Sequence, residues 1–180
     1  MSLDTLNTQV DGLRDEAKST ASAYSQQARN IDHDPNLSPE GKTAAKAEVN
    51  TAARDSLRTL SRKETEAINM KVRDLEKQLD SKMGSTATDM IAFRDAQDRA
   101  EKFDNPDDAK RVLERAIRSE DTSLAHAIFR RAIDANWRDV IATFGSEYPD
   151  KKDIVGELAY LKDAQKSTLA RGMHYMWMNQ

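Results

Sequence analysis

Apolar positions recur at helical spacing along the N-terminal part of the chain. Two series repeat every seven residues: Leu3, Val10, Ala17, Tyr24 and Ile31 in one, and Leu6, Leu13, Thr20 and Gln27 in the other. This 3-4 spacing is typical of a helix that packs along another helix in a coiled coil. We expect this first helix to span about residues 4–29. An amphipathic helix that lies on its own protein explains the pattern equally well.

A connector at residues 30–37 should separate this helix from a longer second one. Asp34 precedes Pro35 and is therefore pushed out of helical dihedral angles. Residues 38–40 then provide an N-cap serine, a proline in the first turn and an acidic residue, which together mark a helix start. No proline follows before Gly84, and an apolar stripe runs through this segment: Ala45, Val49, Ala53, Leu57, Leu60, Ile68, Val72, Leu75, Leu79 and Met83.

One narrow stripe leaves most of such a helix in water, so the second helix needs a partner. The partner is either the first helix, folded back, or another subunit, and the sequence leaves both open. Glu64 interrupts the stripe. We predict a protein-interaction face and a homo-oligomer, with the face formed by Leu57, Leu60, Ile68, Val72, Leu75 and Leu79.

The second half of the chain predicts a compact cluster of shorter helices. Apart from Tyr24, every aromatic residue follows position 92, and aromatic side chains bury the most apolar area per residue. Helix starts are expected near Thr86 or Thr88, at Pro106, at Thr122 or Ser123, at Trp137 in a helix ended by Gly145, and at Pro149. Their uneven spacing argues against a repeat solenoid.

The predicted fold is therefore all-α. A long N-terminal helical hairpin or coiled-coil arm (residues 1–84) precedes a compact multi-helix domain (residues 85–180), with the boundary at Gly84. No segment alternates apolar and polar residues over the length of a strand.

Composition excludes several classes of protein. The 180 residues carry 28 Lys and Arg against 31 Asp and Glu, and no Cys, so a disulfide scaffold and thiolate chemistry are excluded. No apolar run approaches the roughly 20 residues that span a bilayer, and the N-terminus lacks a secretory signal pattern. We expect no membrane association.

Candidate catalytic and metal-binding residues are few. Asp32, His33 and Asp34 are adjacent, but ligands of one ion usually come from two elements, so a solvated turn is expected there. Carboxylates beside Lys or Arg are expected to form solvated helical pairs, namely Glu64, Glu66, Asp74 and Glu76. No phosphate-binding loop or nucleophile motif occurs. We expect no enzyme, no cofactor, no bound metal and no small-molecule substrate.

Basic residues mark the middle of the second helix: Arg58, Arg62, Lys63, Lys71, Arg73 and Lys77. Acidic residues interleave with them, whereas helices that bind nucleic acid usually keep one sign of charge on one face. Arg118, Arg130 and Arg131 could add a basic patch. A helical nucleic-acid binder remains the lesser alternative.

The C-terminus has an unusual apolar composition. Leu169, Met173, Met176 and Trp177 recur at i, i+4, i+7 and i+8, and methionine-rich surfaces adapt to many partners. These four residues either close the core of their own domain or anchor a partner. We include them among the predicted interaction residues.

Two stretches carry a resemblance to a known group of proteins. They are residues 36–42 (NLSPEGK), which lead into the long charged helix, and residues 125–140 (AHAIFRRAIDANWRDV), which are followed by Pro149. This layout resembles helical proteins encoded among the head and assembly genes of tailed bacteriophages and prophages of actinobacteria.

The resemblance implies a non-enzymatic virion structural or assembly role, as a minor capsid, scaffold-like or connector component. It also implies other virion proteins as partners, beside the self-association expected from the stripe, in the virion or in the host cytoplasm during assembly. A cytoplasmic bacterial interaction or regulatory protein, dimerising through the long helices, is the first alternative.

Overall fold

The computed structural model describes residues 2–80 and 87–176, with the backbone alone for residue 80 and residues 87–90. In this part of the chain helices alternate with short connections and no strand is present, which confirms the predicted all-α class. The α-helices are α1 (Leu3–His33), α2 (Pro39–Asp80), α3 (Ala87–Ala100), α4 (Pro106–Arg118), α5 (Thr122–Ala135), α6 (Arg138–Glu147), α7 (Lys152–Lys166) and α8 (Thr168–Gly172). Two 3-10 turns accompany them, η1 (Pro149–Lys151) and η2 (Met173–Tyr175).

Contacts divide the chain into two compact units. The first unit contains residues 1–70 and 167–180, and the second contains residues 71–166. The helix α2 runs through both, so that residues 71–80 of this helix belong to the second unit.

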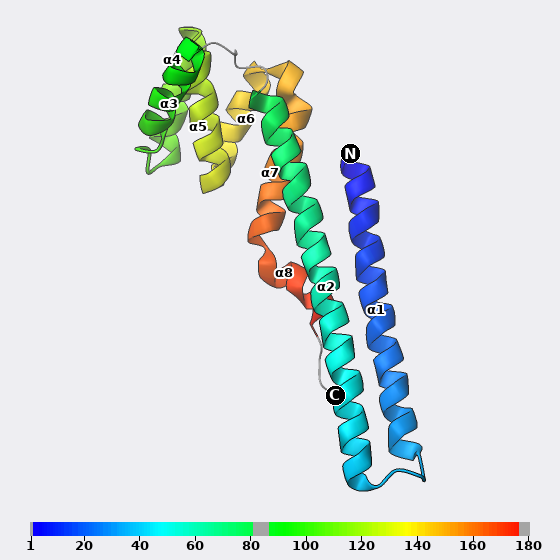
Figure 1. Cartoon of the computed structure of the whole chain (residues 1–180). Helices are drawn as coiled ribbons and strands as arrows, with labels where there is room; N and C mark the ends of the chain where they lie inside the picture. The colour runs from blue at the N-terminus through cyan, green and yellow to red at the C-terminus, as the bar shows by residue number, and fades with distance from the viewer. Residues whose placement is uncertain (1, 81–86, 177–180) are drawn as a thin grey trace. The chain divides into compact units, whose positions relative to one another are not determined.

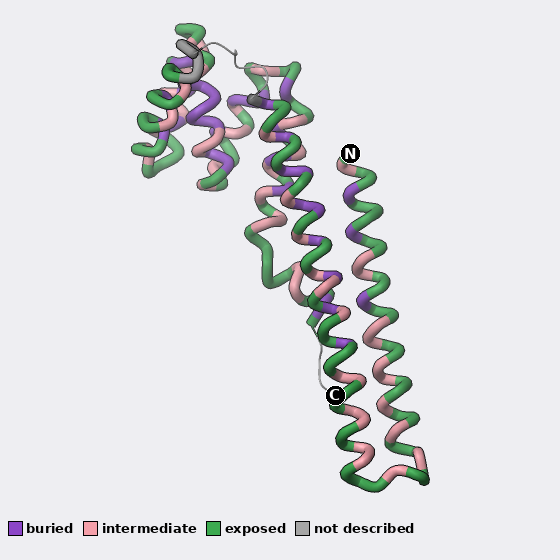
Figure 2. The backbone as a smooth tube through the Cα atoms, in the orientation of Figure 1, coloured by how far each residue is buried: buried purple, intermediate pink, exposed green. Residues whose placement is uncertain are grey.

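The first unit is built on a hairpin in which α1 lies alongside α2 (Figure 1). Buried residues line α1 at Leu6, Val10 and Ala17, and α2 at Ala53, Leu57 and Leu60. Figure 2 shows buried stretches on both helices in the part of the hairpin away from the connecting loop, and a mixture of intermediate and exposed residues elsewhere. The first helix therefore folds back on the second within one chain, which answers the question that the sequence left open.

The hairpin loop is tied down from both helices. α1 continues to His33 and thus ends later than the predicted Arg29, because Pro35 restricts only the residue directly before it. The Lys46 ammonium lies 2.7 Å from the Asp32 carboxylate and lowers the pKa of that carboxyl group. At the start of α2 the Ser38 hydroxyl accepts a hydrogen bond of 3.1 Å from the Gly41 amide, as expected of an N-cap.

The second unit packs around α5. Most residues of this helix are buried, namely Leu124, Ala125, His126, Ala127, Ile128, Phe129, Ala132 and Ile133, and α3, α4, α6 and α7 all contact it. The rings of Phe129 and Phe144 stack with 4.3 Å between their centroids, and Tyr148 lies 4.6 Å beyond Phe144. Phe129 and Phe144 are thus buried in a core whose other buried apolar residues are aliphatic, whereas Tyr160 of the same unit is exposed.

Local signals at the helix ends differ from the predictions in two places. Asp121, and not Thr122 or Ser123, caps α5, since its carboxylate accepts a hydrogen bond of 3.0 Å from the Leu124 amide. Gly145 is buried inside α6, which continues to Glu147, so Gly145 does not end that helix. Ser167 separates α7 from α8, and the sequence made no prediction for the end of α7.

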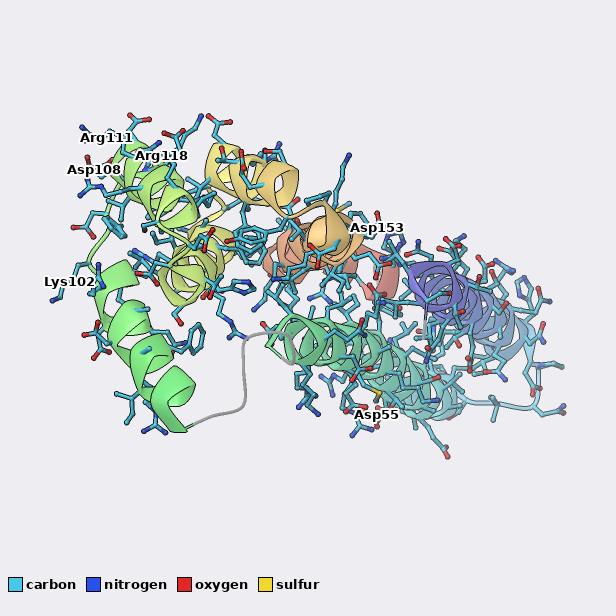
Figure 3. All side chains as sticks on the ribbon, turned by 90° about the horizontal axis from the view of Figure 1, so that it is seen from above. Asp55, Lys102, Asp108, Arg111, Arg118 and Asp153 are labelled. Atoms are coloured by element: carbon cyan, nitrogen blue, oxygen red, sulfur yellow. The ribbon has the colours of Figure 1, made fainter. Side chains whose placement is uncertain are left out.

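Exposed helix faces carry local ion pairs, and Figure 3 labels one of them on α4. Asp108 there pairs with Arg111 one turn later and also accepts a hydrogen bond from Asn105. Both contacts lower the pKa of Asp108, and the hydrogen bond from Asn105 has the larger effect. None of the helices among the described residues is both long and apolar enough for a transmembrane span.

The division into units differs from the boundary predicted at Gly84, a residue that lies outside the described ranges. Residues 71–80 join the second unit because Val72, Leu75 and Leu79 are buried and the Lys71 ammonium lies 2.6 Å from the Glu157 carboxylate. The C-terminal residues join the first unit through Tyr175, whose ring packs with residues of the hairpin.

Candidate interaction surface

The predicted interaction face on α2 is not exposed. Its six residues are between 1% and 4% exposed, namely Leu57, Leu60, Ile68, Val72, Leu75 and Leu79. The chain buries these side chains itself, so the narrow stripe finds its partners without a second subunit. The stripe is therefore covered within one chain, and self-association itself stays a prediction.

Glu64, which interrupts the apolar stripe, forms the centre of a buried polar cluster. Its side chain is 1% exposed. Arg14 of α1 donates two hydrogen bonds to the Glu64 carboxylate, of 2.9 Å and 3.3 Å, and the Tyr175 hydroxyl of η2 donates a third, of 2.5 Å. Three elements of the first unit thus meet at one carboxylate, which we call the Glu64 cluster (Arg14, Glu64 and Tyr175).

The electrostatics of the Glu64 cluster are those of a paired buried charge. Burial, together with the hydrogen bond to Glu64, raises the pKa of the Tyr175 hydroxyl well above its ordinary value. The hydrogen bond to Glu64 likewise raises the pKa of Arg14. Both donors therefore keep their protons at neutral pH, and Arg14 supplies the positive charge beside the carboxylate. The prediction of a solvated helical pair is wrong for Glu64.

Other charged residues of α2 fall into two groups. Arg62 and Glu66 form a solvated i,i+4 pair at 4.0 Å, as predicted. Glu76, in contrast, pairs with Lys162 of α7 at 2.9 Å, and the buried Lys71 pairs with Glu157 of the same helix. These two ion pairs join α2 to α7 within the second unit, and the buried Lys71 is therefore not part of an exposed basic surface.

The C-terminal segment (residues 167–176) presents most of its apolar residues to solvent. Leu169, Met173 and Met176 are 78%, 68% and 62% exposed. Tyr175, between the two methionines, is buried against the hairpin. Trp177, the fourth residue predicted for this stripe, lies outside the described residues. We call Leu169, Met173 and Met176 the outer face of the segment.

The Asp32, His33 and Asp34 triplet serves the hairpin loop. Asp32 binds Lys46, the His33 ring lies 2.7 Å from the Arg29 carbonyl oxygen, and Asp34 accepts a hydrogen bond from the Asn36 amide. Among the described residues no group of three metal-ligating side chains converges on one point. The triplet therefore has a structural account in the loop itself.

Burial of a histidine beside a lysine is the most unusual feature of the second unit. The Lys151 ammonium lies 2.9 Å from Nε2 of His126, and these side chains are 8% and 1% exposed. Burial, and then the charge of Lys151, lowers the pKa of His126 to about 3. The imidazole is therefore neutral and accepts a hydrogen bond from the ammonium, which also lies 4.8 Å from the centroid of the Tyr148 ring.

The arginines considered for a basic patch on α5 are engaged within the second unit. Arg131 donates hydrogen bonds of 3.2 Å and 3.3 Å to the Phe103 carbonyl oxygen and lies over the Trp137 ring. Arg130 lies over the Phe93 ring, with 5.9 Å to the centroid. Both guanidinium groups thus fix α3 and its following loop to α5.

An open groove of about 550 Å³ runs between α6 and α7. Small residues line much of it, among them Ala142, Gly145, Gly156 and Ala159, and the exposed Tyr160 lies at its side. A Cβ atom added at Gly156 would meet no atom within 4 Å. The internal packing of the unit therefore does not require a glycine at that position.

Sequence reasoning missed the Glu64 cluster and the His126–Lys151 pair. A signal existed for the first, because a glutamate that replaces an apolar residue within a buried stripe needs a partner. The identity of that partner was not readable, since Tyr175 comes from the other end of the chain. For His126 the signal was its place among the apolar residues of α5.

Comparison with known proteins adds no further identification: no family model, curated protein or solved structure matches this chain. The functional conclusion therefore depends on the geometry and on the sequence resemblance described above.

Proposed function

We propose that this protein is a non-enzymatic structural or assembly protein of a tailed bacteriophage or prophage, acting through helix-mediated protein contacts. The observation that carries the protein-contact role is the outer face of the C-terminal segment, where three large apolar side chains remain exposed. The phage context is supported by the resemblance of residues 36–42 and 125–140. The proposed partners are other virion proteins and further copies of this chain.

The outer face suits a protein surface better than a small ligand. Leu169 lies on α8, Met173 begins η2 and Met176 follows η2, and all three side chains are exposed and can enter an apolar groove on a partner. Methionine side chains adapt to irregular surfaces because they are unbranched and polarizable. Burying a single leucine or methionine side chain contributes about 1.5–3 kcal/mol, so burial of all three on a partner would favour binding.

The role does not require chemistry at the buried polar groups. The Glu64 carboxylate is paired within its own unit by Arg14 and Tyr175, and the Lys151 ammonium donates to Nε2 of His126. Nδ1 of His126 is buried and has no hydrogen-bond partner among the described residues. We propose a structural part for the Glu64 cluster and the His126–Lys151 pair, with no catalytic step, no cofactor and no nucleic-acid substrate. The proposed location is the virion, or the host cytoplasm during assembly.

Particle incorporation tests this proposal. The gene is co-expressed with the neighbouring genes of its genome, assembled particles are purified on a density gradient, and the chain is quantified by mass spectrometry. We expect the chain in a fixed copy number per particle or per assembly intermediate. Genomic neighbours without head or assembly genes, together with absence from every assembly, would overturn the phage role in favour of a host interaction protein.

A further inference from the structure

We propose that the C-terminal segment (residues 167–176) is a releasable strap on the α1–α2 hairpin, with Tyr175 as its latch. Among these ten residues, all of which the structure describes, Tyr175 alone is buried. Its ring packs with Ala17 of α1 and with Leu57 and Leu60 of α2. The strap therefore covers part of the hairpin seam with the Tyr175 side chain. This inference concerns the isolated chain and does not depend on the proposed function.

The strap has little structure of its own to hold it in place. It contains five residues of α-helix and a single 3-10 turn, and helices this short are unstable in isolation. Ser167 breaks the helical path between α7 and α8. Its position is thus fixed mainly by contacts with the hairpin, in which η2 meets α1.

Release of the strap leaves no buried charge without its counterion. When Tyr175 departs, the Glu64 carboxylate keeps both hydrogen bonds from Arg14. The lost hydrogen bond comes from a neutral hydroxyl, and water can replace it at a carboxylate that the departing ring has uncovered. Opening therefore breaks one hydrogen bond of Tyr175 and avoids the larger free-energy cost of separating a buried ion pair.

Opening changes the accessibility of Leu57 and Leu60. Both are at most 3% exposed in the closed arrangement, and both lie in the apolar stripe that the sequence marks as a contact face. The closed state does not bury the outer face of the strap, since Leu169, Met173 and Met176 stay in solvent. The strap is thus a two-position element whose state sets the exposure of the seam.

Thiol labelling measures this opening directly, because the chain contains no cysteine. Leu57→Cys places a single thiol beneath the strap, and Leu6→Cys places a matched thiol at another buried leucine of α1 that is not part of the cluster around Tyr175. The full-length variants are incubated with a chromogenic disulfide reagent under native conditions. We expect the thiol at position 57 to react at least tenfold faster than the thiol at position 6.

Tyr175→Phe, added to each variant, tests the latch. This substitution removes the hydroxyl and keeps the ring, and it should accelerate labelling at position 57 several-fold while leaving position 6 unchanged. Equal labelling rates at both positions, with equal responses to Tyr175→Phe, would overturn the strap, because the seam would then open only by unfolding of the whole unit.

Hydrogen exchange on the cysteine-free chain provides a second measurement if a cysteine variant fails to fold. Tyr175→Phe should speed exchange of the amides in residues 168–176 and leave those of α7 unchanged. An unchanged rate in residues 168–176 would contradict the role of Tyr175 as latch.

Discussion

Tyr175 and Glu64 are 111 positions apart in the sequence, yet the Tyr175 hydroxyl donates a hydrogen bond of 2.5 Å to the Glu64 carboxylate. The carboxylate is buried on α2, and Arg14 of α1 supplies the compensating charge. One side chain from the end of the chain thus completes a polar cluster inside the helical hairpin. This arrangement links the folding of the hairpin to the placement of the C-terminal segment.

The Glu64 cluster predicts an asymmetric response to mutation. Arg14→Met leaves a buried carboxylate without its cation, and we expect it to lower the free energy of unfolding by about 3 kcal/mol. Glu64→Met replaces the charge with an apolar side chain of similar length. Because Arg14 is 26% exposed and can turn to water, this variant should lose less than about 1.5 kcal/mol.

Urea denaturation of both variants and of the double variant measures these values. The double variant should recover part of the loss seen in Arg14→Met, since the unpaired charge is gone. Equal losses in the two single variants would show that the carboxylate is not buried with Arg14 as its counterion.

His126 predicts acid sensitivity of the second unit. Its pKa in the folded protein, about 3, lies below the value of about 6.5 of an unfolded histidine. The unfolded state therefore binds an extra proton between these values, and stability is lost as pH falls from about 6.5. The slope is at most about 1.4 kcal/mol per pH unit.

Chemical denaturation at pH 7, 6 and 5 checks this slope. His126→Gln retains a polar side chain and should flatten the dependence over that range, where most carboxyl groups are still ionised. A variant with the same pH dependence as the wild type would show that His126 does not titrate in this way.

Gly156 and Gly12 predict stabilising substitutions. Both lie inside helices, and a Cβ atom at either position meets nothing within 4 Å. Because glycine loses more backbone entropy than alanine in a helix, Gly156→Ala and Gly12→Ala should each raise the free energy of unfolding by about 0.5–1 kcal/mol. Thermal melting with calorimetry measures the change, and a loss of stability in either variant would contradict the open space described around it.

Fragments test the boundary of the second unit. Residues 71–166 retain Val72, Leu75 and Leu79, together with the pairs of Lys71 with Glu157 and of Glu76 with Lys162. Residues 85–180, the domain expected from the sequence, lack all of these. We expect the first fragment to melt cooperatively and at a higher temperature. A more stable 85–180 fragment would restore the boundary at Gly84.

Much of the fold was predictable because helix signals are local. Heptad spacing in α1, the cap at Ser38 and the start of α4 at Pro106 all depend on residues within one or two turns. The antiparallel pairing of α1 with α2 was one of two alternatives, since an apolar stripe does not specify which copy of the chain covers it.

The environments of the candidate-site residues were less predictable, because they depend on contacts between distant parts of the sequence. Leu57 and Leu60 have the same pattern whether a subunit or Tyr175 covers them. The sequence pattern does not distinguish Glu64 from its solvated neighbour Glu66, because Tyr175, which bonds to Glu64, is far away in the sequence. The sequence named Leu169, Met173 and Met176 as candidates, and the structure adds that these side chains are exposed, while their part in an interaction stays a prediction.

Binding through the outer face is tested by the double substitution Leu169→Ser with Met173→Ser. Both side chains are exposed, so the free energy of unfolding should stay within about 0.5 kcal/mol of the wild type. Ile91→Ser, at an exposed isoleucine of α3 in the second unit, is the matched control. It should change neither stability nor assembly.

The decisive measurement is the amount of each variant that co-sediments with particles assembled from the neighbouring gene products. Loss of two buried apolar contacts should weaken incorporation at least tenfold, since about 1.4 kcal/mol corresponds to a factor of ten in affinity. Wild-type incorporation of the double variant would contradict binding through this face. So would a large drop in its melting temperature, because the two side chains would then belong to the core.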